Sequence, residues 1–238
     1  MNILAIDTSC DVLSLALHHG SGFSSPMGTQ CIDIEAGSRH SELLMEWIDR
    51  LFSSAGMKPQ DLELVACMKG PGSFTGLRIG FAAAKGLSLA LGIPLAAIPT
   101  LDCMAYGLSI WPGLVLSVID AKKNCFFAAL YRGGERLSDY LDTGSGTLFL
   151  TIESYKLNPA EAAAITGPGA PLFFSQLEAQ DETLSLRNNI FLDPLFSKGR
   201  ALELLQFLKK KYIFNTYIEV DTGPLYIRKS DAELNLGK

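Results

Sequence analysis

The sequence predicts an α/β protein made of two related lobes. An order of three strands, then helix, strand, helix and strand, runs through residues 2–98 and begins again near residue 100. In both halves the first strand ends in an aspartate, Asp7 and Asp120, which indicates an internal duplication. Strands that alternate with helices favour mixed sheets with flanking helices. We therefore expect lobes at 1–100 and 101–195, followed by a C-terminal helix and tail at 196–238.

In the first half, apolar runs predict strands at 2–7 and 12–17, with a weaker strand near 27–35. The next helix opens at Ser38 or at His40-Ser41 and ends before Gly56, because glycine commonly terminates helices. The remaining elements expected in this half are a buried strand at 62–68, a helix at 74–91 and a short strand at 94–98.

The second half repeats these signals in a similar order. It opens with a helix at 100–109 and an apolar strand at 114–119 that leads into Asp120. Further strands are expected at 126–131, 137–142, 162–166 and 189–192, and further helices at 171–179 and 197–211.

Composition limits the class of protein. Hydrophobic residues make up 48% of the 238 residues and charged residues 19%, which is enough to build a core. No segment has the roughly 18 unbroken apolar residues of a membrane span, and the first residues lack the basic region of a signal peptide. The five cysteines are scattered, which favours reduced thiols in a cytoplasm. A net charge of −5 is poorly suited to holding a nucleic-acid backbone unaided.

The glycine-rich stretch at 69–91 looks like a phosphate loop but lacks the residues of one. A Walker A loop needs Lys and then Ser or Thr after its last glycine. Here Leu77 follows Gly76, and Phe81 follows Gly80. We interpret the stretch as a turn followed by a helix in which small residues allow another backbone to approach closely.

Two helices of the first half have more apolar surface than one core requires. On the helix at 41–55, large apolar side chains spread over at least half the circumference, against the roughly 100° that a single core covers. On the helix at 74–91 the clear charged stripe is only Arg78 and Lys85, and a row of small residues repeats every four positions. Either the sheets of the lobe cover this surplus, or a partner protein does. Trp47 is the first candidate for an interface anchor.

Candidates for chemistry lie at the strand ends. Asp7-Thr8-Ser9 has the form of a phosphate-binding hairpin, although the tripeptide alone favours an ordinary polar turn. Asp120 lies at the equivalent place in the second half. Gly167-Pro168-Gly169 is either a turn that a nucleotide approaches or a plain strand-to-helix turn. The three histidines show no metal-binding pattern, since His18 and His19 are adjacent on a strand and Leu44 follows His40 by one helical turn.

Six motifs, in order, resemble the TsaB family, also called YeaZ. They are Met-Asn-Ile-Leu-Ala-Ile-Asp-Thr-Ser at 1–9, Arg-His-Ser-Glu-Leu-Leu at 39–44, Gly-Pro-Gly-Ser-Phe-Thr-Gly-Leu-Arg-Ile-Gly at 70–80, Asp-Ala-Lys-Lys-Asn at 120–124, Ile-Thr-Gly-Pro-Gly at 165–169 and Pro-Leu-Tyr-Ile-Arg at 224–228. The block at 70–80 is the most specific, and together the motifs cover most of the chain.

The resemblance implies an actin-like fold of the Hsp70 and sugar-kinase type, with a duplicated βββαβα unit in two lobes. It implies a cytoplasmic, non-catalytic subunit of the complex that makes N6-threonylcarbamoyladenosine at position 37 of tRNAs. Its partners would be the transferase TsaD and the ATPase TsaE, with a homodimer when it is alone and with tRNA reached only through the complex. TsaD-type proteins carry a His-x-x-x-His metal pair that this sequence lacks.

The resemblance also implies roles for individual residues. A helical bundle would form the partner interface, with contributions from Leu43, Leu44, Trp47, Leu51, Phe74, Thr75, Gly76, Arg78, Gly80 and Ala84. Binding of ATP or ADP would be absent, weak or vestigial, at Asp7, Thr8, Ser9, Asp120, Gly167 and Gly169. No catalytic residue and no metal site are expected. The alternative is an enzyme, a nucleotide-dependent small-molecule kinase or carbamoyl-type transferase that uses these same strand-end residues.

Overall fold

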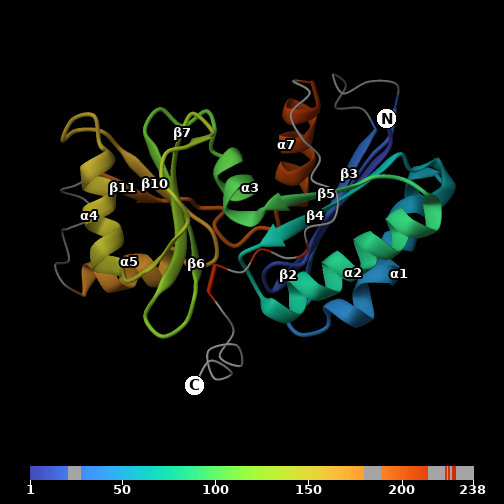
Figure 1. Ribbon diagram of the computed structural model, residues 1–238, viewed down its shortest axis with the longest axis horizontal. Helices are drawn as coiled ribbons and strands as arrows, with labels where there is room; N and C mark the ends of the chain where they lie inside the picture. Colours follow the sequence, from blue (N-terminus) through green and yellow to red (C-terminus); the bar gives the residue numbers. More distant parts are fainter. Residues whose placement is uncertain (21–27, 180–188, 214–222, 224, 226, 229–238) are drawn as a thin grey trace. The chain divides into compact units, whose positions relative to one another are not determined.

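Two sheets with helices beside them make up the computed structural model (Figure 1). The structure describes residues 1–20, 28–179, 189–213, 223, 225, 227 and 228 of the 238-residue chain. The chain divides into two units. Unit 1 joins Met1–Cys103 to the later segment that begins at Ser197, and unit 2 contains Met104–Phe196 with described C-terminal residues such as Arg228. The C-terminal helix is thus part of unit 1, and the tail expected beyond residue 213 lies mostly outside the described residues.

Unit 1 contains a five-stranded sheet in the order β3-β2-β1-β4-β5. The first three strands, β1 (Ile3–Asp7), β2 (Val12–His18) and β3 (Thr29–Glu35), form an antiparallel meander. The strands β4 (Leu64–Gly70) and β5 (Leu95–Pro99) continue the sheet in parallel with β1. The helices are α1 (His40–Ala55), α2 (Phe74–Leu91), α3 (Thr100–Tyr106), which runs across the division between units, and α7 (Ala201–Ile213), with a short 3-10 turn at Pro59–Asp61.

Alternation along β1 separates two apolar layers in unit 1. Leu4 and Ile6 face α1 and α2, whereas Ile3 and Ala5 face α7. All four side chains are fully buried. The helices α1 and α2 therefore cover one face of the sheet and α7 covers the other, as Figure 1 also shows.

Unit 2 repeats the same topology, which confirms the predicted duplication. Its sheet has the order β11-β10-β6-β7-β8, and β9 also pairs with β7. The central strand β6 (Leu114–Asp120) pairs antiparallel with β7 (Phe126–Arg132) and parallel with β10 (Ala163–Thr166), as β1 does with β2 and β4. The remaining elements are β8 (Glu135–Arg136), β9 (Leu141–Thr143), α4 (Ser145–Tyr155), α5 (Ala170–Glu178) and β11 (Ile190–Leu192).

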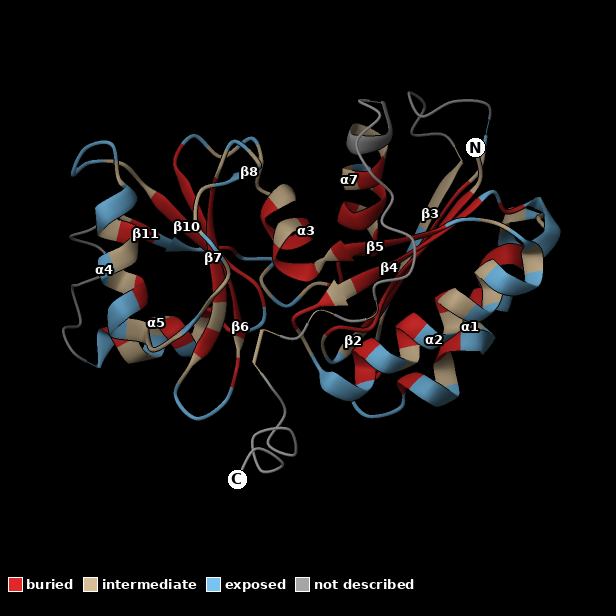
Figure 2. Ribbon diagram, viewed as in Figure 1, coloured by how far each residue is buried: buried red, intermediate tan, exposed pale blue. Residues whose placement is uncertain are grey.

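Burial in unit 2 is concentrated between the sheet and two helices (Figure 2). Phe173 on α5 meets Phe126 on β7 edge to face, with ring centroids 5.9 Å apart. Leu148 and Ile152 attach α4 to the same core. The sequence did not predict α4, and the strand expected at 137–142 is replaced by the short pieces β8 and β9. In the part of the chain that is described, no helix is both long and apolar enough to cross a bilayer.

Candidate interaction surface and strand-end turns

The glycine-rich segment before α2 is a packed turn. The Ser73 hydroxyl accepts a hydrogen bond from the backbone N–H of Gly76 and so caps the helix. The Ser73 N–H donates to the carbonyl oxygen of Ser9 at 2.7 Å. A Cβ atom on Gly72 would lie 2.6 Å from that same oxygen. The turn is therefore shaped by contact with residues 7–9 of its own chain.

The small-residue row of α2 packs on Thr8. The Thr8 hydroxyl donates to the Gly76 carbonyl oxygen at 2.8 Å. A Cβ atom on Gly76 would lie 2.0 Å from the Thr8 carbonyl oxygen, and one on Gly80 would lie 2.2 Å from Thr8 Oγ1. The predicted close approach of another backbone is thus found, but the segment that approaches these two glycines belongs to the same chain.

Asp7 is enclosed by donors from its own chain. Its side chain is fully buried, and Oδ1 accepts hydrogen bonds from the Ser9 N–H at 2.9 Å and the Ser9 hydroxyl at 2.6 Å. Oδ2 accepts from the backbone N–H of Arg200 at 3.0 Å. Burial raises the pKa of Asp7, and these hydrogen bonds partly offset the rise. Thr8 and Ser9 are buried as well, so none of the three offers its side chain to the surface here.

Asp120, the counterpart of Asp7 in unit 2, is partly exposed and paired with Lys122. Its Oδ1 accepts from the Lys122 N–H and its Oδ2 from the Lys122 ammonium, both at 2.7 Å. Burial alone would raise the pKa of Asp120, but the two hydrogen bonds and the charge of Lys122 outweigh it and lower the pKa. Lys122, Lys123 and Asn124 all have left-handed backbone conformations, with φ of 61°, 55° and 57°.

The two glycines after β10 are required by packing on β6. Gly167 has a φ of 98°, and a Cβ atom there would lie 2.5 Å from the Val118 carbonyl oxygen. A Cβ atom on Gly169 would lie 2.7 Å from the Asp120 backbone nitrogen. These contacts with β6 account for both glycines, as expected for a plain strand-to-helix turn.

Part of the predicted interface lies inside unit 1. The side chains of Leu44, Leu51 and Ala84 are buried in the core beneath α1 and α2, and Gly76 and Gly80 are covered by Thr8. These five positions offer no side-chain surface to a partner, because the inner arc of each helix faces the sheet.

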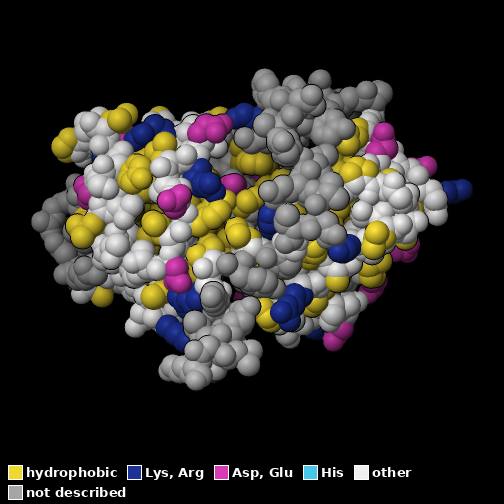
Figure 3. All heavy atoms as spheres, viewed as in Figure 1, with side chains coloured by type: hydrophobic (Ala, Val, Ile, Leu, Met, Phe, Trp, Pro, Cys, Tyr) yellow, Lys and Arg dark blue, Asp and Glu magenta, His cyan; other side chains and the backbone are white. Residues whose placement is uncertain are grey.

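The other predicted positions lie on or near the surface. Leu43 and Trp47 are partly buried against the core, whereas Phe74, Thr75 and Arg78 are exposed. Met45 (53% exposed) and Leu89 (73%) also reach the surface, although neither was among the predicted interface residues. Where Figure 1 draws α1 and α2, Figure 3 shows hydrophobic side chains among cationic and acidic ones.

Each of these two helices presents an aromatic ring covered by an arginine. The Arg78 guanidinium carbon lies 3.7 Å from the centroid of the Phe74 ring, and that of Arg50 lies 4.6 Å from Trp47. The first pair is at the start of α2, with 47% of Phe74 exposed. Such pairs combine apolar area with a positive charge, a combination that is enriched at protein interfaces.

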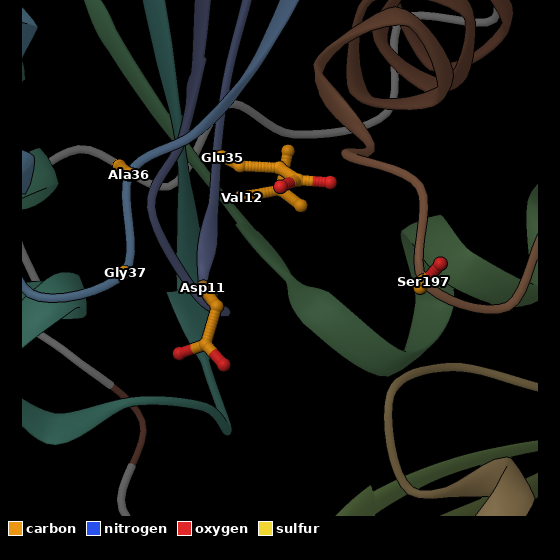
Figure 4. Close-up of a pocket in the computed structure, with 6 residues that line it drawn as sticks. All are labelled: Asp11, Val12, Glu35, Ala36, Gly37 and Ser197. Atoms are coloured by element: carbon orange, nitrogen blue, oxygen red, sulfur yellow. The ribbon is translucent and has the colours of Figure 1, made fainter.

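A cavity of about 450 Å³ lies at the ends of β2 and β3 in unit 1 (Figure 4). Asp11 and Val12 line it at the start of β2, and Glu35, Ala36 and Gly37 line it at the end of β3 and just beyond. Ser197 comes from the loop before α7. Sequence reasoning missed it, because Ser197 is distant in the chain. Among the described residues, no three His, Cys, Asp or Glu side chains are grouped as ligands for a metal ion.

Comparison with known proteins identifies relatives. A family model described as tRNA N6-adenosine threonylcarbamoyltransferase, TsaD, matches residues 34–177. The tRNA threonylcarbamoyladenosine biosynthesis protein TsaB of Bacillus subtilis is 35% identical over 132 residues, 56% of either chain. TsaB of Escherichia coli is 34% identical over 57% of either chain. The match thus spans little more than half the length of these curated relatives. A tRNA N6-adenosine threonylcarbamoyltransferase of Thermus thermophilus is 31% identical over 87% of this chain and 68% of its own.

Solved structures agree on the fold. YeaZ from Pseudomonas aeruginosa has a TM-score of 0.71 at 22% identity, covering 95% of this chain and 99% of that one. The ethanolamine utilization protein EutJ from Carboxydothermus hydrogenoformans has a TM-score of 0.50 at 11% identity, covering 87% and 90%. At these identities the likeness concerns the fold, and it confirms the predicted actin-like architecture of two lobes.

Proposed function

Because the chain belongs to the TsaB (YeaZ) family, we propose that it is a non-catalytic subunit of a tRNA-modifying complex. The complex makes N6-threonylcarbamoyladenosine at position 37 of tRNAs. In it, this chain pairs with TsaD and works with the ATPase TsaE, and it reaches tRNA only through the complex. When alone, it forms a homodimer in the cytoplasm through the surface that otherwise pairs with TsaD.

The exposed Phe74–Arg78 pair at the start of α2 is the observation that best supports a pairing role. Phe74 leaves nearly half its area exposed and lies within the block that most closely resembles the family. Met45 and the Trp47 ring beneath Arg50 extend the apolar surface onto α1, which contacts α2, and the Arg50 guanidinium is also paired with Glu46 at 2.6 Å. Aromatic and arginine anchors of this kind account for much of the affinity at protein interfaces.

The burial of Asp7 supports the non-catalytic part of the proposal. A carboxylate that binds a nucleotide or its metal ion must be reachable, but every described hydrogen bond to Asp7 comes from within its own unit. The histidine pattern points the same way, because His40 is followed one turn later by Leu44 and not by a second histidine. We therefore propose that the chain needs no nucleotide of its own to act.

Reconstitution tests this function. The purified chain, supplied with tRNA and threonylcarbamoyl-adenylate, should transfer no threonylcarbamoyl group, whereas adding TsaD and TsaE with ATP should give transfer. Modified adenosine is measured by mass spectrometry of digested tRNA. Transfer by this chain alone would support the alternative of a carbamoyl-type transferase. No gain when the chain is added to TsaD and TsaE would refute the role as a subunit.

Matched variants test the surface. Phe74→Ser removes the ring beneath Arg78, and Tyr140→Ser removes an analogous ring beneath Arg136, 4.2 Å away, in unit 2. Phe74→Ser should weaken pairing with TsaD about 10- to 100-fold, the usual range for an interface anchor, and Tyr140→Ser should leave it unchanged. Calorimetric titration measures both affinities. Equal affinities for the two variants would rule out the start of α2 as the pairing surface.

A further inference from the structure

The turn at Asp7, Thr8 and Ser9 lies between two helices that cover opposite faces of the unit 1 sheet. One is α2, which packs on Thr8 through Gly76 and Gly80. The other is α7, which shares an apolar layer with Ile3 and Ala5 of β1. A single three-residue turn therefore contacts elements that are separated by the whole thickness of the sheet.

On the α7 side, side chains from the first two strands accept hydrogen bonds from the start of the helix. The backbone N–H of Arg200 donates to Asp7 Oδ2 at 3.0 Å, and that of Ala201 donates to the Ser14 hydroxyl at 3.2 Å. The first N–H groups of a helix lack partners within it and need acceptors of this kind. Asp7 thus satisfies the backbone N–H at the N-cap position of α7, although it lies 193 positions earlier in the chain.

The loop before α7 fits closely on the sheet. A Cβ atom on Gly199 would lie 2.3 Å from Ser14 Cβ and 2.8 Å from Asp33 Oδ1. Ser14 in turn donates its hydroxyl proton to Asp33 Oδ1. The same loop contributes Ser197 to the cavity beside Asp11 and Glu35. A side chain at position 199 would therefore displace the loop from the strands.

Hydrogen bonds continue without a gap from α7 to α2. Arg200 donates to one oxygen of the Asp7 carboxylate, and Ser9 donates to the other through both its N–H and its hydroxyl. The Ser9 carbonyl oxygen then accepts from Ser73, the N-cap residue of α2. We propose that this turn couples the seating of α7 to the seating of the first turn of α2, so that loosening either helix start loosens the other. Every contact in the path lies within this chain.

Hydrogen exchange by NMR tests the coupling at two amides, Arg200 for α7 and Ser73 for α2. Gly199→Ala disturbs only the α7 end, because its added methyl meets Ser14 and Asp33. We expect exchange of the Arg200 amide to speed up roughly fivefold or more, the effect of losing one helix cap, and exchange of the Ser73 amide to speed up with it. Faster exchange at Arg200 with an unchanged rate at Ser73 would overturn the proposal.

The reverse experiment starts from α2. Gly80→Ala places a methyl group against Thr8 Oγ1, and coupling between two sites is reciprocal, so exchange at Arg200 should rise. Gly86→Ala lies on the same helix with open space around the added atom, and it should change neither amide. Asp7→Asn, which removes the charge at the centre of the path, should speed both. If Asp7→Asn does not fold, the two glycine variants decide the question, and a rise at Ser73 alone in Gly80→Ala would refute the coupling.

Discussion

Thr8 and Gly80 lie so close together that a Cβ atom at position 80 would be 2.2 Å from the Thr8 hydroxyl oxygen. Glycine inside a helix usually lowers stability by about 0.5–1 kcal/mol relative to alanine. Gly76 and Gly80 accept that loss because Thr8, directly after β1, occupies the space that their side chains would need. The feature that predicted a partner helix thus serves first to hold α2 on its own sheet.

Substitution of the glycines of α2 by alanine should therefore have opposite effects at two positions. Gly76→Ala should lower the free energy of unfolding by about 1–3 kcal/mol, because the new methyl overlaps the Thr8 carbonyl oxygen, 2.0 Å from its ideal position. Gly86→Ala should raise it by about 0.5–1 kcal/mol, since its surroundings are open. Urea denaturation measures both. Destabilisation of similar size in the two variants would argue against the Thr8 contact.

The stability of the chain should depend on the ionisation of Asp7. Burial raises the pKa of Asp7 in the folded chain above its ordinary value of 3.8, so the folded state retains this proton to a higher pH than the unfolded state does. Between the two pKa values the contribution of Asp7 to the free energy of unfolding must fall as pH rises.

Asp7→Asn lacks that contribution. The unfolding free energy of the wild type minus that of the variant should therefore decrease as pH rises between the unfolded and folded pKa values of Asp7. Urea titrations at a series of pH values starting at about 4 measure it, with the exposed Asp11→Asn as the control. A difference that rises with pH would contradict the assigned direction.

Removal of the Lys122 ammonium should raise the pKa of Asp120. Hydrogen bonds from Lys122 hold that pKa below its ordinary value against the opposing effect of burial. In Lys122→Met the backbone hydrogen bond remains and the ammonium is lost, so the carboxyl should titrate at higher pH. The stabilisation that the pair provides is present above the unfolded pKa and is lost as pH falls through the folded one. A ¹³C NMR titration of the carboxyl group measures the shift, and Lys123→Met should not reproduce it.

Arg228 binds β9 and the turn between β6 and β7 in unit 2. Its guanidinium group makes two hydrogen bonds to Asp142 and a third to the Ala121 carbonyl oxygen at 3.0 Å. Lysine cannot reproduce this planar fork, so Arg228→Lys should lower the free energy of unfolding by about 1–2 kcal/mol. Arg136→Lys, at an exposed site, should change it by less than about 0.5 kcal/mol. Denaturation curves that coincide for Arg228→Lys and wild type would refute the anchor.

Local signals predicted most elements of the fold. The helix expected at 74–91 is found at Phe74–Leu91, because Ser73 caps its start and Gly92 ends it in a left-handed conformation. The helix α4 escaped prediction because Gly146 and the β-branched residues after it favour helix weakly, and burial of Leu148 and Ile152 in the unit 2 core stabilises it.

Prediction of the candidate site from sequence was limited by long-range contacts. The surplus of apolar side chains identified α1 and α2. Which arc of each helix faces outward depends on the sheet beneath it, and Leu44 and Leu51, predicted at the interface, lie in the core. The strand-end pattern left Asp7 either as part of a phosphate-binding hairpin or as part of an ordinary polar turn. Its donor, Arg200, lies far along the chain, and no local pattern reports such a contact.

The return of the chain to unit 1 at α7 has a consequence for synthesis on the ribosome. Residues 1–103 leave the exit tunnel first, yet one face of their sheet stays uncovered until α7 has been made, more than 90 residues later. At about 5–20 residues per second, that interval lasts several seconds. The sheet of unit 2 and both of its flanking helices are complete before then. We expect the nascent first lobe to be the part of this protein that recruits chaperones, and the synthesis of α7 to release them.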